Sequence, residues 1–168
     1  MNILITGGSR GIGAAAVRLF RARGDSVWFL YEKRHEQAQA LSRETGAAAI
    51  CCDVANAEQV QAAFSSLPAL DALICVTLRR SLPPLPVPHW KLVPQRVVAG
   101  IGCRRDTPWS LLCTLLDRQL AAQRLDPLAL KAIGSVSLKA NEPGLRQLAH
   151  RCRVPFETFS AEALREHE

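Results

Sequence analysis

A glycine-rich turn near the N-terminus constrains the fold of this chain more than any other feature. Gly7, Gly11 and Gly13 follow the apolar run 2–6, and a helical pattern continues from there to residue 23. Glycines at such a point let the backbone turn tightly and approach a pyrophosphate, and the free N–H groups at the start of the helix attract its charge. Strand, turn and helix together predict a dinucleotide-binding unit.

Strands and helices alternate through most of the sequence. The expected strands are 2–6, 26–31, 47–52, 70–76, 96–101, 131–138 and 155–159, and the expected helices are 11–23, 35–44, 58–66, 108–124, 141–152 and 161–165. This alternation predicts an α/β fold with Rossmann-like parallel βαβ units in both halves. These units would form either two small domains or one doubly wound sheet.

Residues 79–95 interrupt the alternation, because five of these seventeen residues are proline. Proline has no N–H donor and pushes the preceding residue out of the helical region. The segment is interpreted as an extended linker, with a proline-rich ligand for a partner domain as the alternative. The predicted organisation is a partial NAD(P)-binding half at 1–78, the linker at 79–95 and a second domain at 96–168.

The Thr-Gly-x-x-x-Gly-x-Gly spelling at 6–13 resembles the short-chain dehydrogenase/reductase family. The resemblance implies NAD(P) binding and places Asp53-Val54, which follow the third strand, near the adenine; a plain strand-ending Asp is the alternative. Arg10, Lys33 and Arg34 favour a 2′-phosphate and hence NADP(H), whereas the carboxylate of Glu32 weakens this preference. The predicted cofactor-binding residues are Gly7, Ser9, Arg10, Gly11, Ile12, Gly13, Lys33, Arg34, Asp53 and Val54.

The sequence departs from that family in its chemistry. The family uses a Tyr whose pKa is lowered by a Lys four residues later. Here the only tyrosine is Tyr31, and His35 stands four residues after it. The family also has an Asn-Asn-Ala-Gly-like turn after the fourth strand, where this chain reads Cys-Val-Thr-Leu at 75–78. Oxidoreductase activity by the family mechanism is therefore not expected, although the cofactor could still bind.

The second half carries three strand-to-helix junctions with polar or glycine residues. The first is a glycine turn beside Arg104 and Arg105, which would gather N–H groups into an anion-binding concavity, with Thr107 as the expected helix cap. The second lies at 137–145 and the third at 156–164. Because ligands bind at the carboxyl ends of parallel strands, the three junctions should converge.

These three strings, in this order and spacing, resemble the C-terminal domain of the cobalamin-biosynthesis proteins CobE and CbiG over about 96–165. The resemblance implies a role in corrin-ring assembly, either binding a corrinoid precursor or acting in a hydrolase that opens the lactone of cobalt-precorrin-5A. That family domain normally continues further, so the domain is expected to be truncated. No catalytic residue is identified, and Glu142 and Cys103 are candidates only by position. The predicted substrate-binding residues are Gly100, Gly102, Cys103, Arg104, Arg105, Thr107, Lys139, Asn141, Glu142 and Ser160.

Charge and composition narrow the expected partners. Residues 1–75 hold seven Lys/Arg and seven Asp/Glu, whereas residues 76–168 hold fourteen and eight, so the second half carries the whole net charge of +6. This asymmetry favours an anionic partner such as a polycarboxylate corrin precursor, although solubility alone would also explain it. Few aromatic residues accompany the arginines, so nucleic acid is not expected.

Location and assembly follow from the same composition. The six cysteines show no metal-binding spacing, and no metal site is expected. The N-terminus has no signal-peptide pattern and no apolar run spans a membrane, so a cytoplasmic protein is expected. A homodimer through exposed sheet edges is one way in which such small domains would hide them.

Three functions remain open from the sequence. The first is a corrin-ring biosynthesis component, and the second is an NADP-binding module without the catalytic Tyr and Lys. The third is a fusion of two gene fragments without a function, which the abrupt change of pattern at residues 75–78 and the irregular linker would explain.

Overall fold

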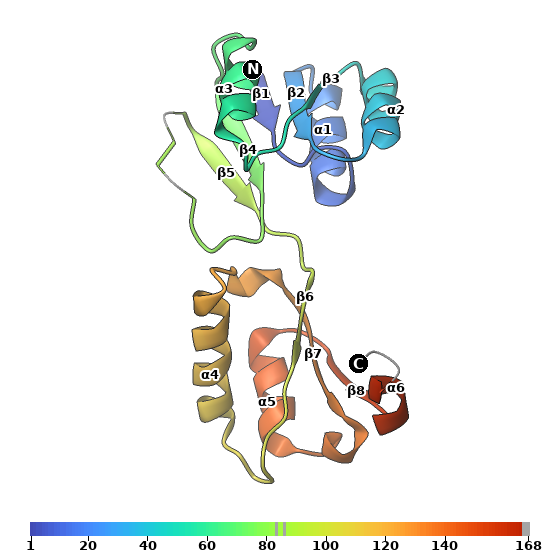
Figure 1. Cartoon of the computed structure of the whole chain (residues 1–168), viewed down its shortest axis with the longest axis vertical. Coiled ribbons are helices and arrows are strands. Elements are labelled where there is room, and N and C mark those ends of the chain that lie inside the picture. Colours follow the sequence, from blue (N-terminus) through green and yellow to red (C-terminus); the bar gives the residue numbers. More distant parts are fainter. Residues whose placement is uncertain (83, 86, 166–168) are drawn as a thin grey trace. The chain divides into compact units, whose positions relative to one another are not determined.

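The computed structural model describes residues 1–82, 84–85 and 87–165. They form two compact units (Figure 1). Unit 1 comprises Met1–Thr77 and Leu82–Pro94, and unit 2 comprises Leu78–Ser81 and the described residues from Gln95 onward. The strands form two separate parallel sheets rather than one doubly wound sheet.

Unit 1 is built on a five-stranded parallel sheet of order β3-β2-β1-β4-β5. Its elements are β1 (Asn2–Ile5), α1 (Gly11–Ala22), β2 (Ser26–Tyr31), α2 (His35–Thr45), β3 (Ala48–Cys51), α3 (Ala57–Ser65), β4 (Ala72–Val76) and β5 (His89–Leu92). Helices α1 and α2 pack on one face around Phe29 and Ile74, and α3 packs on the other around Leu4 and Leu30 (Figure 1). This two-sided burial explains why the inner strands are apolar throughout.

The proline-rich segment 79–95 differs from the linker that the sequence predicts. Four of its residues, which contain no proline, form β5 beside β4. Pro88 and Pro94 flank this strand, and the Pro88 carbonyl accepts a hydrogen bond from the N–H of Leu73 at 2.9 Å. Proline has no N–H donor for strand pairing, so it is tolerated at strand ends, where that donor is not needed. Part of the expected linker therefore belongs to the first sheet.

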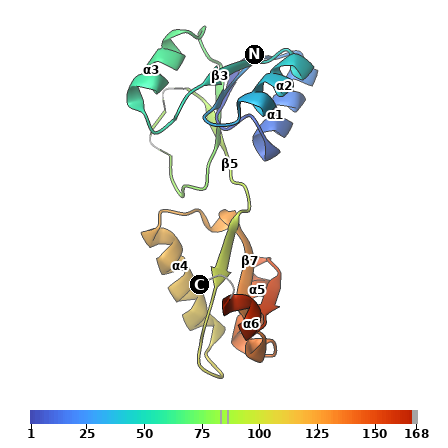
Figure 2. The same cartoon turned by 45° about the vertical axis from the view of Figure 1, so that its right-hand side comes forward.

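Unit 2 is built on a three-stranded parallel sheet of order β6-β7-β8. Its elements are β6 (Val97–Gly100), α4 (Trp109–Ala122), β7 (Leu130–Val136), α5 (Pro143–Cys152), β8 (Phe156–Phe159) and α6 (Ala161–Arg165), with short 3₁₀ turns at Pro127–Ala129 and Ser137–Lys139 (Figure 2). Helices α4 and α5 pack together on one face around Leu112, Leu116, Ile133, Leu145 and Leu148. Residues 78–81 join this unit through an antiparallel bridge between Arg79 and Leu125.

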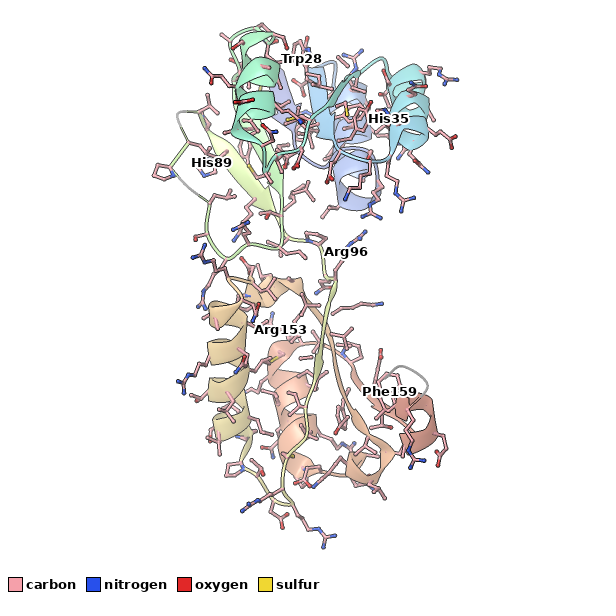
Figure 3. All side chains as sticks on the ribbon, viewed as in Figure 1. Trp28, His35, His89, Arg96, Arg153 and Phe159 are labelled. Carbon is pink, nitrogen blue, oxygen red and sulfur yellow. The ribbon has the colours of Figure 1, made fainter. Side chains whose placement is uncertain are left out.

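The opposite face of the unit 2 sheet is open. The side chains of Val98 and Phe159 are 51% and 39% exposed on it, and a Cβ added at Gly134 would meet both, at 3.9 Å and 3.2 Å. Figure 3 shows Phe159 on β8 beside the short helix α6. An apolar face without a cover is unusual in a parallel sheet, which normally carries helices on both sides.

The six cysteines differ in their exposure to solvent. All six cysteines are free thiols, and Cys52 and Cys75 are buried as small hydrophobic residues, whereas Cys51 is exposed, because it lies on the edge strand β3. Within the described residues, no group of three or more His, Cys, Asp or Glu side chains is arranged to hold a metal ion. None of the helices described is both long enough and apolar enough to cross a bilayer.

Candidate functional sites

The glycine turn of unit 1 has the close packing that a dinucleotide-binding turn needs. Gly7 and Gly11 adopt positive φ angles of 63° and 54°, a region that glycine enters without strain. A Cβ at Gly13 would lie 2.2 Å from the Gly7 carbonyl oxygen, so the start of α1 sits directly against the turn. Gly8, which the sequence analysis did not single out, has equally little room, because its Cβ would lie 2.4 Å from Cβ of Phe29.

The N-terminus of α1 offers N–H groups without a competing carboxylate. Arg10 is the N-cap residue but makes no side-chain cap hydrogen bond, and no acidic residue lies in the first turn. The turn is held from both sides, since Gly8 N–H donates to the Leu30 carbonyl at 3.0 Å and Val76 N–H donates to the Thr6 hydroxyl at 3.0 Å. A helix N-terminus of this kind can accept a phosphate group.

The residues predicted to contact the adenosine end lie at the carboxyl ends of β2 and β3. Lys33 is paired with Glu32 at 3.0 Å, and this hydrogen bond raises the pKa of the Lys33 ammonium group. Arg34 is exposed at the start of α2. Asp53 Oδ1 accepts a hydrogen bond from Ala55 N–H at 2.8 Å, so this carboxylate holds its own turn, and Val54 is exposed beside it.

Tyr31 cannot replace the tyrosine of reductase chemistry. It is buried at the end of β2, and its hydroxyl lies 3.0 Å from Nδ1 of His35, which Figure 3 shows at the start of α2. Burial, with a smaller contribution from the nearby Cys51, raises the pKa of the Tyr31 phenol. A catalytic tyrosine base needs the opposite shift.

In unit 2, the buried Glu142 carboxylate joins the first and second junctions. Its Oε1 accepts a hydrogen bond from the N–H of Asp106 at 2.7 Å, and its Oε2 accepts one from Lys139 Nζ at 3.2 Å. Asp106 has a φ of 60°, so the loop turns sharply where it meets Glu142. A Cβ at Gly144 would lie 2.1 Å from the Thr107 carbonyl oxygen. Glu142 and Lys139 thus fix the loops rather than face solvent.

The loop after β6 presents some predicted residues and hides others. Arg104 and Arg105 are exposed, and an added Cβ at Gly100 or Gly102 would meet no atom within 4 Å. Cys103 instead packs against the core between the sheet and the helices.

The prediction that Thr107 caps helix α4 is wrong. Thr107 Oγ1 donates to the Arg104 carbonyl at 2.8 Å, and Pro108 is the N-cap residue of α4. Thr107 therefore tightens the loop and does not satisfy the helix. Proline in the N-cap position fits because its fixed φ leads into the first turn.

A hollow of about 460 Å³, which we call the strand-end hollow, is lined by residues of β6 and β7 and by residues of the first and third junctions, whereas no residue of the second junction, 137–145, lines it. Ser160 Oγ accepts from Ala163 N–H at 3.1 Å and so belongs to the turn into α6, whereas Asn141 is exposed outside the lining. Gly134 in an apolar strand is, like Gly8, a signal that sequence reasoning missed. The lining residues are Val98, Gly100, Ile101, Gly102, Gly134, Ser135, Val136, Phe159 and Leu164.

Family models match the two halves of the chain separately. The model described as cobalamin synthesis G C-terminus matches residues 97–168, and the model described as enoyl-(acyl carrier protein) reductase matches residues 7–74. The chain matches two families. Its first half belongs to the short-chain dehydrogenase/reductase family, and its second half is similar to the cobalamin synthesis G C-terminal family.

Two curated proteins support the same division. The chain is 80% identical over 102 residues to a cobalt-precorrin-5A hydrolase of Salmonella typhimurium (strain LT2), covering 61% of this chain and 29% of the hydrolase. It is 40% identical over 80 residues to a probable NADP-dependent dehydrogenase of Dichelobacter nodosus, covering 44% of this chain and 74% of that protein. A solved structure of CobE, a protein from the cobalamin biosynthetic pathway, is 38% identical, with a TM-score of 0.41, and covers 42% of this chain and 50% of that one.

The hydrolase-like stretch reaches beyond the cobalamin synthesis G C-terminal segment. An aligned stretch of 102 residues in a chain of 168 must include residues 67–102, wherever it begins. It therefore contains β4 and β5, whereas the reductase family model ends at residue 74. The first sheet is thus assembled from reductase-like strands and from at least one strand, β5, that lies in the hydrolase-like stretch.

Proposed function

We propose that unit 2 binds an anionic corrin-ring precursor, as a component of the hydrolase-type step on cobalt-precorrin-5A. The observation that carries this proposal is the strand-end hollow, which residues of the first and third strand-to-helix junctions line, in a chain that is 80% identical over 102 residues to a cobalt-precorrin-5A hydrolase. The hollow is apolar and bordered by glycines, which suits the flat face of a macrocycle.

Two exposed arginines close in sequence to the lining would recognise the carboxylates of such a precursor. Arg104 and Arg105 follow Gly102, which lines the hollow, and both are exposed. Guanidinium groups bind carboxylates through charge-assisted hydrogen bonds that are stronger than neutral ones. Lys139 is less suited to this role than the sequence predicts, because Glu142 already pairs with it.

The test is a visible-absorbance titration of the full chain with cobalt-precorrin-5A. We expect a saturable spectral shift, and the double variant Arg104→Ala/Arg105→Ala should weaken binding by about 10-fold or more. Arg118→Ala removes an exposed positive charge from α4 and should leave the affinity unchanged. Absence of a shift with cooperatively folded protein would overturn the proposal, and measuring acetaldehyde release would distinguish hydrolysis from binding alone.

We infer a second function, NADP(H) binding, for unit 1. The supporting observation is the start of α1, which packs on the glycine turn and carries no acidic residue. Gly7, Ser9, Gly11, Ile12 and Gly13 would hold the pyrophosphate, and Arg10 and Arg34 would meet the 2′-phosphate. The nicotinamide would supply hydride chemistry when bound, but Tyr31 and His35 provide no proton donor of the family type.

Fluorescence titration with NADPH tests this second function. We expect saturable binding without turnover of carbonyl substrates, and loss of binding in Arg10→Ala/Arg34→Ala if NADP(H) rather than NAD(H) is the ligand. A folded chain that binds neither NADPH nor the corrin precursor would favour the fusion without a function.

Six free cysteines fit a reducing compartment, so we propose that the protein is cytoplasmic.

A further inference from the structure

A second concave surface of unit 2 lies on its helices rather than at the strand ends. We call this surface the helix groove. It has a volume of about 460 Å³ and is lined by Trp109, Arg146, Gln147, His150 and Arg151. Trp109 begins α4, and the other four residues belong to α5. None of these five residues lines the strand-end hollow.

The four α5 residues share one face of that helix. Arg146 and His150 are four residues apart, as are Gln147 and Arg151, so each pair lies on neighbouring turns. The residues of α5 that are buried against the core are Gly144, Leu145, Leu148 and Ala149. Packing of α5 therefore leaves two guanidinium groups, an imidazole and an amide together on the groove side.

Trp109 orients one of these groups. The guanidinium carbon of Arg151 lies 4.6 Å from the centroid of the Trp109 ring. Stacking on an aromatic face stabilises a guanidinium through its flat surface and leaves the N–H donors at its edge available. The donors of Arg151 are thus partly preorganised for a planar, bidentate acceptor such as a carboxylate or a phosphate.

The positive charge of the helix groove is not matched by carboxylates. Among the described residues, Arg146, His150 and Arg151 make no salt bridge, whereas Lys139 in the same unit is paired with Glu142. The carboxylate of Asp117 on α4 accepts a weak hydrogen bond from Cys113 Sγ at 3.8 Å. Burial raises the pKa of the Cys113 thiol most, Asp117 raises it further, and Arg151 lowers it.

We propose that the helix groove binds a small ligand with two or more oxyanion groups, either phosphates or carboxylates. Two arginines provide N–H donors, the glutamine amide provides an NH₂ group, and the histidine provides a protonatable ring toward such a ligand. A volume of this size also lies within the range of small-molecule pockets. This site does not depend on the corrin proposal, because it uses none of the residues at the strand ends.

The test is a two-dimensional NMR titration of the full ¹⁵N-labelled chain with inorganic pyrophosphate and, separately, with citrate. Of the three tryptophan indoles, only that of Trp109 lies in the groove, so Trp28 and Trp90 are internal references. We expect saturable shifts of the Trp109 indole and the Gln147 side-chain amide, with a dissociation constant below about 1 mM.

Variants with one charge removed at a time make the test specific. Arg146→Gln and Arg151→Gln should each weaken binding by about 10-fold. Arg118→Gln, on the exposed surface of α4, should not weaken it, and Arg104→Ala/Arg105→Ala should leave it intact even if corrin binding is lost. Equal weakening by Arg118→Gln, or shifts that are matched by sodium chloride at the same ionic strength, would overturn the proposal.

The comparison of probes identifies the source of the oxyanions. Tighter binding of pyrophosphate points to a free phosphate compound, whereas tighter binding of citrate points to a polycarboxylate. Titration with the corrin precursor should then shift the Trp109 indole only in the second case. Shifts by neither probe, with all three indole signals of a folded chain present, would refute the site.

Discussion

The two units of this molecule use the same close contact at the start of a helix, but over different distances along the chain. In unit 1, Gly13 packs against the carbonyl of Gly7, within one motif. In unit 2, Gly144 packs against the carbonyl of Thr107, which belongs to a different junction. The first contact forms inside a single turn, whereas the second requires β6, α4 and β7 to be folded already.

This difference decides how each site is built. The glycine turn of unit 1 needs only neighbours from β2 and β4 to hold it, through Leu30 and Val76. The site of unit 2 needs Glu142 to join the loop at Asp106 to the turn at Lys139. A contact between distant junctions costs more loop-closure entropy than a local one, so it must be held by stronger interactions. A buried carboxylate that accepts two hydrogen bonds is such an interaction.

Glycine substitutions should give the largest effects. Gly144→Ala and Gly13→Ala place a methyl group about 2 Å from a carbonyl oxygen, which the backbone must move to accommodate. We expect each to destabilise its own unit by roughly 1–3 kcal/mol, which exceeds any gain in helix propensity. Native-state hydrogen exchange would measure the two units separately.

Gly100→Ala is the matched control for both substitutions. Its added Cβ would meet no atom within 4 Å, so the stability should change by no more than about 0.5 kcal/mol. If Gly144→Ala were as neutral as this control, the contact between the junctions would not be needed, and the contrast between the units would disappear.

The next largest effect should come from Glu142. Glu142→Ala removes the acceptor for both Asp106 N–H and Lys139, and we expect a loss of about 1–2 kcal/mol, because Lys139 can turn toward water. Glu142→Gln keeps an oxygen for Asp106 N–H and should lose less. Denaturant unfolding followed by unit 2 signals would show this order, with the exposed Glu157→Gln as the control. Equal losses for the two Glu142 variants would contradict the role of the backbone contact.

A smaller effect concerns pH and unit 1. Tyr31 is the only tyrosine, so ultraviolet titration reports it alone. Because burial raises the pKa of its phenol, we expect it to ionise above the ordinary value of about 10. The unfolded chain then loses its proton first, so unit 1 should lose stability as pH rises above that value. Ionisation at the ordinary value would show that Tyr31 is solvated.

The smallest effect should be at the surface of unit 1. Arg18 and Glu44 join α1 and α2 through two hydrogen bonds of 2.6 and 2.7 Å, and this contact lowers the pKa of the Glu44 carboxyl. Both side chains are about half exposed, so water and salt screen the pair. Glu44→Gln should leave thermal unfolding unchanged within error, and a clear loss at unit 1 would contradict this expectation.

Much of the fold could be predicted from the sequence, because hydrophobic periodicity and glycine turns act locally. All seven predicted strands are present, but β5 is an eighth, in the segment interpreted as a linker. Proline content predicted an extended chain there, and the strand β5 at His89–Leu92 is extended. Pairing of that chain with β4 depends on residues far from it in the sequence, such as Leu73, and no local pattern reports them.

The candidate sites divide in the same way. Arg104 and Arg105 lie on the surface, as the loop pattern predicts, because nothing in the core can accept their charge. Glu142, Lys139 and Thr107 are also polar, but their side chains are used inside the loops. Residue type shows that a side chain can bind an anion, but only the fold shows whether another group in the chain already uses it.

The sequence by itself therefore determined the α/β class, the resemblance to two families and the local glycine turn of unit 1, since each rests on short motifs whose own residues lie within a few positions of one another. The tertiary structure decided the separation into two sheets, the fifth strand of the first, the strand-end hollow and the helix groove. These features depend on which surfaces remain after packing, and packing joins residues such as Trp109 and Arg151 that no short-range pattern connects.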